Sequence, residues 1–200
     1  MEIKHIMQQL SESVKYRIEN YFNDHLFNED CLRYDLFYFF AQNGIDHKNI
    51  ILEYSHPNEK LSAKAIDMVI KEKSLISFEL KYFREIPSKQ NIDRTGQMAS
   101  FIRDIIKLKL IRDTNFTNKF VVLLTTEEMK KYIMNNGFEK LIDSSIDEEF
   151  VINIERKSPH FTKQIFSKLN LLDYKEFNNL KLKKIYGSEI NHHYLLCYSV

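Results

Sequence analysis

Residues 65–83 constrain the fold more than any other part of the chain. Their sequence, AIDMVIKEKSLISFELKYF, has two apolar runs on either side of a polar turn, a pattern that predicts two antiparallel β-strands. Side chains alternate between the faces of a strand, so the second run carries Leu80 on one face and Glu79 and Lys81 on the other. Asp67 interrupts the first run in the same way. Charged side chains therefore stand within two strands that are otherwise apolar.

The length of the turn decides whether these charges lie together. A three-residue turn, residues 72–74, pairs Lys71 with Leu75 and places Asp67 opposite Glu79. Opposed residues of antiparallel strands point to the same side of the sheet, with Cβ atoms about 4.5–5.5 Å apart. A turn of two or four residues would place Asp67 on the other side. The three-residue turn therefore predicts that the two carboxylates are neighbours.

Two neighbouring carboxylates repel each other unless a cation lies between them. A hard divalent ion such as Mg²⁺ binds oxygen ligands, commonly one or two carboxylates together with waters and a phosphate. We therefore expect Asp67 and Glu79 to hold Mg²⁺, for which Mn²⁺ can substitute, and Lys81 to lie beside the attacking water. The arrangement suits hydrolysis of a phosphodiester, because the ion lowers the pKa of bound water and stabilises the charge of the transition state.

Asp67, followed after eleven residues by Glu79-Leu80-Lys81, resembles the motif of the PD-(D/E)XK nuclease superfamily, which includes many restriction endonucleases. Ile66 stands where the motif's name has proline. The resemblance covers about residues 30–124. It implies a restriction-endonuclease-like α/β fold, a mixed sheet flanked by helices with the core order α-β-β-β-α-β.

The same resemblance implies a function. It indicates a metal-dependent nuclease, most often a DNA endonuclease of the restriction or defence type, with Asp67, Glu79 and Lys81 as its catalytic residues. Double-stranded DNA is the implied substrate, and a homodimer is the expected way to cut both strands in a chain of this size.

Three further residues are candidates for the site. Glu53 lies fourteen residues before Asp67, where several members of the superfamily carry an extra acid, but a surface glutamate at a strand end is an equal alternative. Gln97 begins Q-x-x-x-F, which is similar to the Q-x-x-x-Y of an exonuclease-like branch. Phe101 replaces the tyrosine, and a polar position on a helix face explains Gln97 equally well. Asp35, on the apolar side of a helix, either reaches the metal site or, as we expect, pairs with an Arg or Lys in the core.

Two alternatives to catalysis stay open at this point. The charges on the two strands can be surface residues of an edge strand. The chain can also be a non-catalytic nucleic-acid-binding or assembly module on the same fold, although such a module need not keep all three motif residues. Mg²⁺-dependent nicking of plasmid DNA, with EDTA as a control, distinguishes an enzyme from such a module.

Periodicity along the rest of the chain favours one nuclease-like domain over residues 1–200, with about residues 150–200 as a C-terminal addition to the core. Apolar residues at helical or alternating spacing predict the remaining elements. The expected helices are 3–21, 30–42, 93–110, 127–136 and 161–169, and the expected strands are 49–54, 120–124, 151–155 and 192–200.

Glycine and proline together make up seven of the 200 residues, or 3.5% of the chain, whereas they make up about 12% of an average protein. The four glycines cannot build the loops of Rossmann or P-loop proteins, so these classes are excluded.

The net charge is +1, but residues 60–112 hold twelve Lys or Arg and six Asp or Glu. This excess is compatible with DNA as a partner, with Lys89 and Arg94 as candidates for phosphate contact, although a solvated lysine-rich surface is the simpler explanation.

The chain has no run of about 20 apolar residues, and its N-terminus has no apolar signal region. Two cysteines, Cys31 and Cys197, are too few for a disulfide framework. We therefore expect a cytoplasmic protein with no membrane partner.

Overall fold

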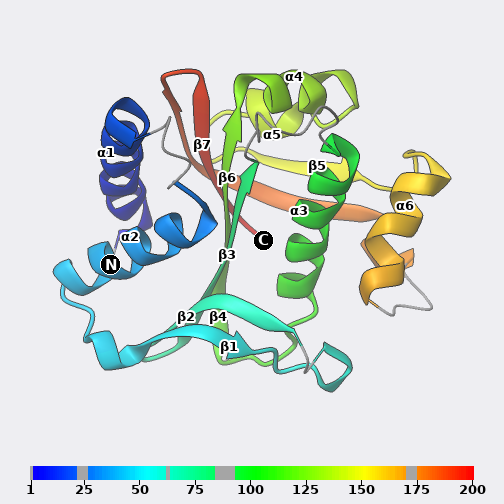
Figure 1. Ribbon diagram of the computed structural model, residues 1–200. Coiled ribbons are helices and arrows are strands. Elements are labelled where there is room, and N and C mark those ends of the chain that lie inside the picture. Colours follow the sequence, from blue (N-terminus) through cyan, green and yellow to red (C-terminus); the bar gives the residue numbers. More distant parts are fainter. Residues whose placement is uncertain (1, 22–26, 62–63, 84–92, 170–174) are drawn as a thin grey trace.

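A seven-stranded sheet forms the centre of the protein in the computed structural model, which describes residues 2–21, 27–61, 64–83, 93–169 and 175–200 (Figure 1). The strand order is β1-β2-β3-β4-β7-β6-β5. β3 and β4 are parallel, whereas the other neighbours are antiparallel. The strands are β1 (Ile50–Ser55), β2 (Ala65–Lys71), β3 (Leu75–Phe83), β4 (Phe116–Thr126), β5 (Glu149–Asn153), β6 (Asn179–Ile190) and β7 (His193–Ser199).

Helices lie on both faces of this sheet (Figure 1). The main helices are α1 (Ile3–Tyr21), α2 (Glu29–Gln42), α3 (Arg94–Lys109), α4 (Glu127–Asn135), α5 (Lys140–Asp143) and α6 (Pro159–Phe166). Short 3₁₀ turns are η2 (His47–Asn49), η3 (Glu59–Leu61), η4 (Ser167–Leu169) and η5 (Lys175–Phe177). Among the described helices, none is both long enough and apolar enough to cross a membrane.

Each face of the sheet has its own apolar core. α1 and α2 pack on the face that carries Phe78 and Leu80 of β3, together with Val122 of β4. α3 packs on the opposite face, whose core includes Val121 and Leu123 of β4, and α6 packs against α3 in the same core. The strict alternation along β3 and β4 therefore assigns Glu79 and Lys81, the neighbours of Leu80, to the face covered by α3.

The expected α/β class and its mixed sheet are confirmed. The elements α2, β1, β2, β3, α3 and β4 follow the predicted order α-β-β-β-α-β. β7 pairs with β4, so the C-terminal strands extend the same sheet. β6 is a strand that the sequence patterns did not predict, although its Leu180 and Leu182 are buried and alternate with exposed Lys181. The alternation is typical of a strand, but the lysines interrupt its apolar character.

The hairpin of β2 and β3 has the predicted turn of residues 72–74. Lys71 pairs with Leu75, and Val69 with Ser77, in the predicted register. The predicted pair of Asp67 with Glu79 is not formed, because the pairing of the two strands ends at Met68 and Phe78. β3 lies between β2 and β4, so the alternative that its charges decorate an edge strand is wrong.

The expected partner of Asp35 is also confirmed. Arg17 of α1 donates to both carboxylate oxygens of Asp35 on α2, at 2.5 and 2.8 Å, and the Ser13 hydroxyl donates at 2.7 Å. These bonds join the two helices, so Asp35 is a structural acid.

Candidate active site

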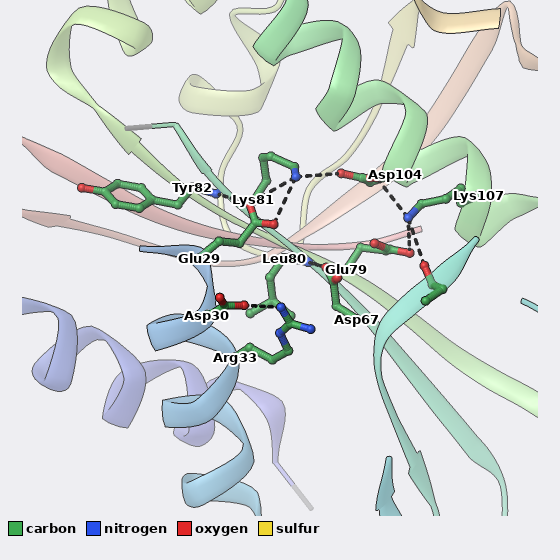
Figure 2. Close-up of polar contacts among 11 residues, drawn as sticks. Glu29, Asp30, Arg33, Asp67, Glu79, Leu80, Lys81, Tyr82, Asp104 and Lys107 are labelled. Atoms are coloured by element: carbon green, nitrogen blue, oxygen red, sulfur yellow. Dashed lines mark hydrogen bonds and ion pairs between the residues drawn. The ribbon is translucent and has the colours of Figure 1, made fainter. Parts of the chain in front are cut away.

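Six charged side chains gather where α2, β2, β3 and α3 meet, and we call this group the charged cluster (Figure 2). The three motif residues are among its members. The others come from the two helices on either side of the sheet. The members are Glu29 of α2, Asp67 of β2, Glu79 and Lys81 of β3, and Asp104 and Lys107 of α3.

Asp67 stands where β2 is irregular on both sides. The pairing of β2 with β3 ends at Met68 and Phe78, one residue short of Asp67, whose Oδ2 accepts a hydrogen bond from the backbone N–H of Leu80 at 2.7 Å. The pairing of β2 with β1 skips Asp67 and Glu53, and Glu53 has a φ of +52°, a conformation that non-glycine residues rarely adopt. The strand therefore turns the Asp67 carboxylate into the space beside β3.

Asp67 lies within electrostatic reach of the other charged groups of the cluster. Its negative charge contributes to the pKa shifts of Glu29, Glu79, Lys81 and Lys107, and also of Arg33 on α2, each of them mainly affected by burial. Asp67 thus interacts with residues from both helical layers, as expected for a position between the strands.

Glu79 is buried, with 1% of its surface exposed. Its Oε1 lies 2.8 Å from Lys107 Nζ and forms an ion pair with it. Burial raises the pKa of the Glu79 carboxyl well above its usual range, and the neighbouring Asp104 and Asp67 raise it further, whereas Lys107 acts in the opposite direction. Burial and the two neighbouring acids therefore outweigh the effect of Lys107 on this carboxyl group.

Lys81 is held between two acids. Its Nζ lies 3.1 and 3.3 Å from the carboxylate oxygens of Glu29 and 3.5 Å from Asp104 Oδ2. Burial by itself would lower the pKa of Lys81, but the charges of Asp104 and Glu29 outweigh it and raise the pKa. Lys81 therefore stays an ammonium ion at neutral pH and can donate hydrogen bonds to a water or a phosphate oxygen.

Glu29 reaches the cluster from the first turn of α2. The Asn28 side chain caps this helix by accepting from the N–H of Cys31. Glu29 Oε2 also accepts from the backbone N–H of Tyr82 at 3.1 Å, which fixes the carboxylate beside Lys81. Burial raises the pKa of Glu29, and the charge of Lys81 opposes the shift.

Sequence reasoning missed Glu29, Asp104 and Lys107. Asp104 lies three residues after Phe101 on the buried face of α3 and has only 8% of its surface exposed, so an acid on an apolar helix face was the available signal. Lys107 follows one turn later, with its Nζ 3.2 Å from Asp104 Oδ1. Glu29 gave no signal, because acids are common in the first turn of any helix.

The other predicted residues lie outside the cluster or outside the described residues. Glu53 has a mostly exposed side chain whose Oε1 lies 3.0 Å from Arg33 Nη1, and Arg33 also contacts Asp30. Gln97 and Arg94 lie in the first turn of α3, with Gln97 two turns before Asp104. Lys89 lies outside the described residues.

The charged cluster fits a hard divalent ion. No group of three or more His, Cys, Asp or Glu side chains in the described part of the chain is arranged as a metal site, but Mg²⁺ needs only one or two carboxylates besides water and phosphate. Glu79 Oε1 and Asp104 Oδ2 are buried carboxylate oxygens that face ammonium groups, at 2.8 Å from Lys107 Nζ and at 3.5 Å from Lys81 Nζ. Oxygen atoms of this kind, beside Asp67, are the ligands that such an ion prefers.

Comparisons with protein-family models, with curated proteins and with solved structures found no match to this chain. The functional interpretation therefore depends on the charged cluster and on the motif residues within it.

Proposed function

We propose that this protein is a metal-dependent nuclease that hydrolyses phosphodiester bonds of double-stranded DNA, an endonuclease of the restriction or defence type on a restriction-endonuclease-like fold. One observation carries the proposal. Asp67 of β2 accepts a hydrogen bond from the backbone N–H of Leu80, the residue between Glu79 and Lys81, and these two side chains form ion pairs with Lys107 and Asp104 of α3. Buried acids beside a lysine are costly in a sheet interior, so a function is the simplest reason for their presence.

Each residue has a role in this proposal. Asp67 and Glu79 hold Mg²⁺ or Mn²⁺, and the bound ion would supply an acidified water and stabilise the charge of the transition state. Lys81 donates a hydrogen bond to the nucleophilic water and orients it. Glu29 and Asp104, at 3.1 and 3.5 Å from Lys81 Nζ, keep that ammonium group charged and in place.

The same contacts also favour a second candidate, a non-catalytic nucleic-acid-binding or assembly module. Glu79 lies beside Lys107, and Lys81 lies beside Glu29 and Asp104, so both motif residues already have charged protein partners. A fold that needed only stability could keep such pairs. The two candidates differ in whether a divalent ion changes what the protein does to DNA.

Incubation with supercoiled plasmid in Mg²⁺, Mn²⁺ or EDTA tests the proposal, and sequencing of the ends identifies the cleavage position. Lys131→Ala and Glu149→Ala are matched controls, because both side chains are more than half exposed and lie on α4 and β5. We expect cleavage that needs the metal ion, is lost in Asp67→Ala and Lys81→Ala, and persists in both controls. Folded protein that binds DNA without cutting it in any ion would favour the module.

A further inference from the structure

We propose that Lys107 is an internal cation on Glu79 that a divalent metal ion must displace, so that it weakens metal binding at this site. This inference depends on the proposed function, because it assumes that Asp67 and Glu79 hold the metal ion. It adds a residue of α3 that controls access of the ion to a motif carboxylate.

The contacts of Lys107 carry the inference. Its Nζ lies 2.8 Å from Glu79 Oε1 and 3.2 Å from Asp104 Oδ1, and it donates a hydrogen bond to the backbone carbonyl of Ala65 at 3.3 Å. Ala65 precedes Asp67 by two residues on β2. The ammonium group therefore bridges β2, β3 and α3 directly beside Glu79, one of the two proposed metal ligands (Figure 2).

Because the Glu79 carboxylate is buried, Lys107 and a divalent ion cannot both contact it. The side chains of Lys107 and Glu79 are only 13% and 2% exposed. Charges that are removed from water interact more strongly than surface charges, and like charges repel over the same short distances. An ammonium ion and a divalent ion on the same buried carboxylate would repel each other, so binding of the metal ion requires Lys107 to move.

Asp104 explains how Lys107 can leave Glu79 without losing its charge partner. Asp104 lies between the two lysines, with Oδ1 3.2 Å from Lys107 Nζ and Oδ2 3.5 Å from Lys81 Nζ. It lies one helical turn before Lys107 on α3, so the two remain neighbours whatever happens at β3. Displacement therefore exchanges one partner of Lys107 and keeps the other.

The two lysines of the cluster thus have different positions. Lys81 contacts Glu29 and Asp104, whereas Lys107 contacts Glu79 directly. Removal of either lysine takes one positive charge from the cluster, but only removal of Lys107 frees the Glu79 carboxylate. This difference separates competition at Glu79 from a general electrostatic effect.

Equilibrium binding of Mn²⁺ at pH 8, followed by the electron paramagnetic resonance signal of the free ion, tests the inference without any activity assay. We expect Lys107→Met to bind Mn²⁺ about tenfold more tightly than the wild-type protein, a change of about 1.4 kcal/mol. Lys107→Gln, a polar variant that also lacks the positive charge, provides the same comparison if Lys107→Met does not fold. Far-UV circular dichroism verifies the fold of each variant.

Three controls complete the experiment. Lys131→Met, on the exposed face of α4, should leave the affinity unchanged, and Glu79→Gln should weaken it. Lys81→Met should increase the affinity much less than Lys107→Met. Equal increases for the two cluster lysines, or unchanged binding in the Lys107 variants, would overturn the inference and leave the nuclease proposal intact. No Mn²⁺ binding by the wild-type protein or by the Lys107 variants would overturn both.

Discussion

Replacing Glu79 by glutamine tests how the fold tolerates a carboxylate in its interior. Glutamine has nearly the shape of a protonated glutamic acid, so the change removes the negative charge and little else. Lys107 keeps its contact with Asp104 Oδ1 at 3.2 Å, so no lysine is left alone. The variant therefore measures the free energy of the buried Glu79 charge together with that of its ion pair with Lys107.

The expected effect depends on pH with a definite sign. An unfolded glutamate has a pKa of about 4.3, whereas burial raises the pKa of Glu79 in the folded protein. Between these two values the folded state binds more protons than the unfolded state, so the free energy of unfolding of the wild-type protein falls as pH rises. The slope for one such group approaches about 1.4 kcal/mol per pH unit. Below both values, the wild-type protein and Glu79→Gln should be equally stable.

Urea unfolding in EDTA at several pH values between 4 and 8 measures this difference. We expect Glu79→Gln to become progressively more stable than the wild-type protein as pH increases. Glu149→Gln is the control, because the Glu149 carboxylate is exposed and the hydrogen bond from Lys181 lowers its pKa. Its ionised form contributes stability that is lost as pH falls, so that variant should show the opposite sign. A Glu79→Gln protein that is less stable at neutral pH, or a difference independent of pH, would refute the reasoning.

Four further outcomes are expected. Asp67→Ala and Lys81→Ala should abolish cleavage and keep the fold. In Asp67→Ala, loss of the hydrogen bond from the Leu80 N–H should lower the free energy of unfolding by about 1 kcal/mol, and a much larger decrease would make Asp67 a structural residue. Labelled duplex should bind in Ca²⁺ without being cut, because Ca²⁺ tolerates looser geometry than Mg²⁺, and binding should weaken steeply with salt; binding that ignores divalent ions would favour the non-catalytic module. Asp35→Ala should lower the free energy of unfolding by about 2 kcal/mol and leave cleavage unchanged, since it removes the bonds from Arg17; loss of cleavage in a folded variant would place Asp35 in the site. Light scattering should give the mass of a homodimer, and a monomer that cuts both strands would contradict that expectation.

The sequence by itself determined the hairpin and the motif residues on it. Alternation within residues 65–83 and the polar turn of residues 72–74 are local features, and they predicted the pairing of Lys71 with Leu75. The same alternation placed Glu79 and Lys81 on one side of β3. Local patterns suffice here because a turn of fixed length sets the register of the two strands that it joins.

Tertiary structure decided how those residues are surrounded. Only the position of β3 between β2 and β4 buries Glu79, and only the packing of α3 on that face brings Lys107 to it. Glu29 and Asp104 reach Lys81 from segments 52 residues before it and 23 residues after it. No pattern along the chain specifies such neighbours, because contacts between distant segments are selected by the packing of whole helices and strands.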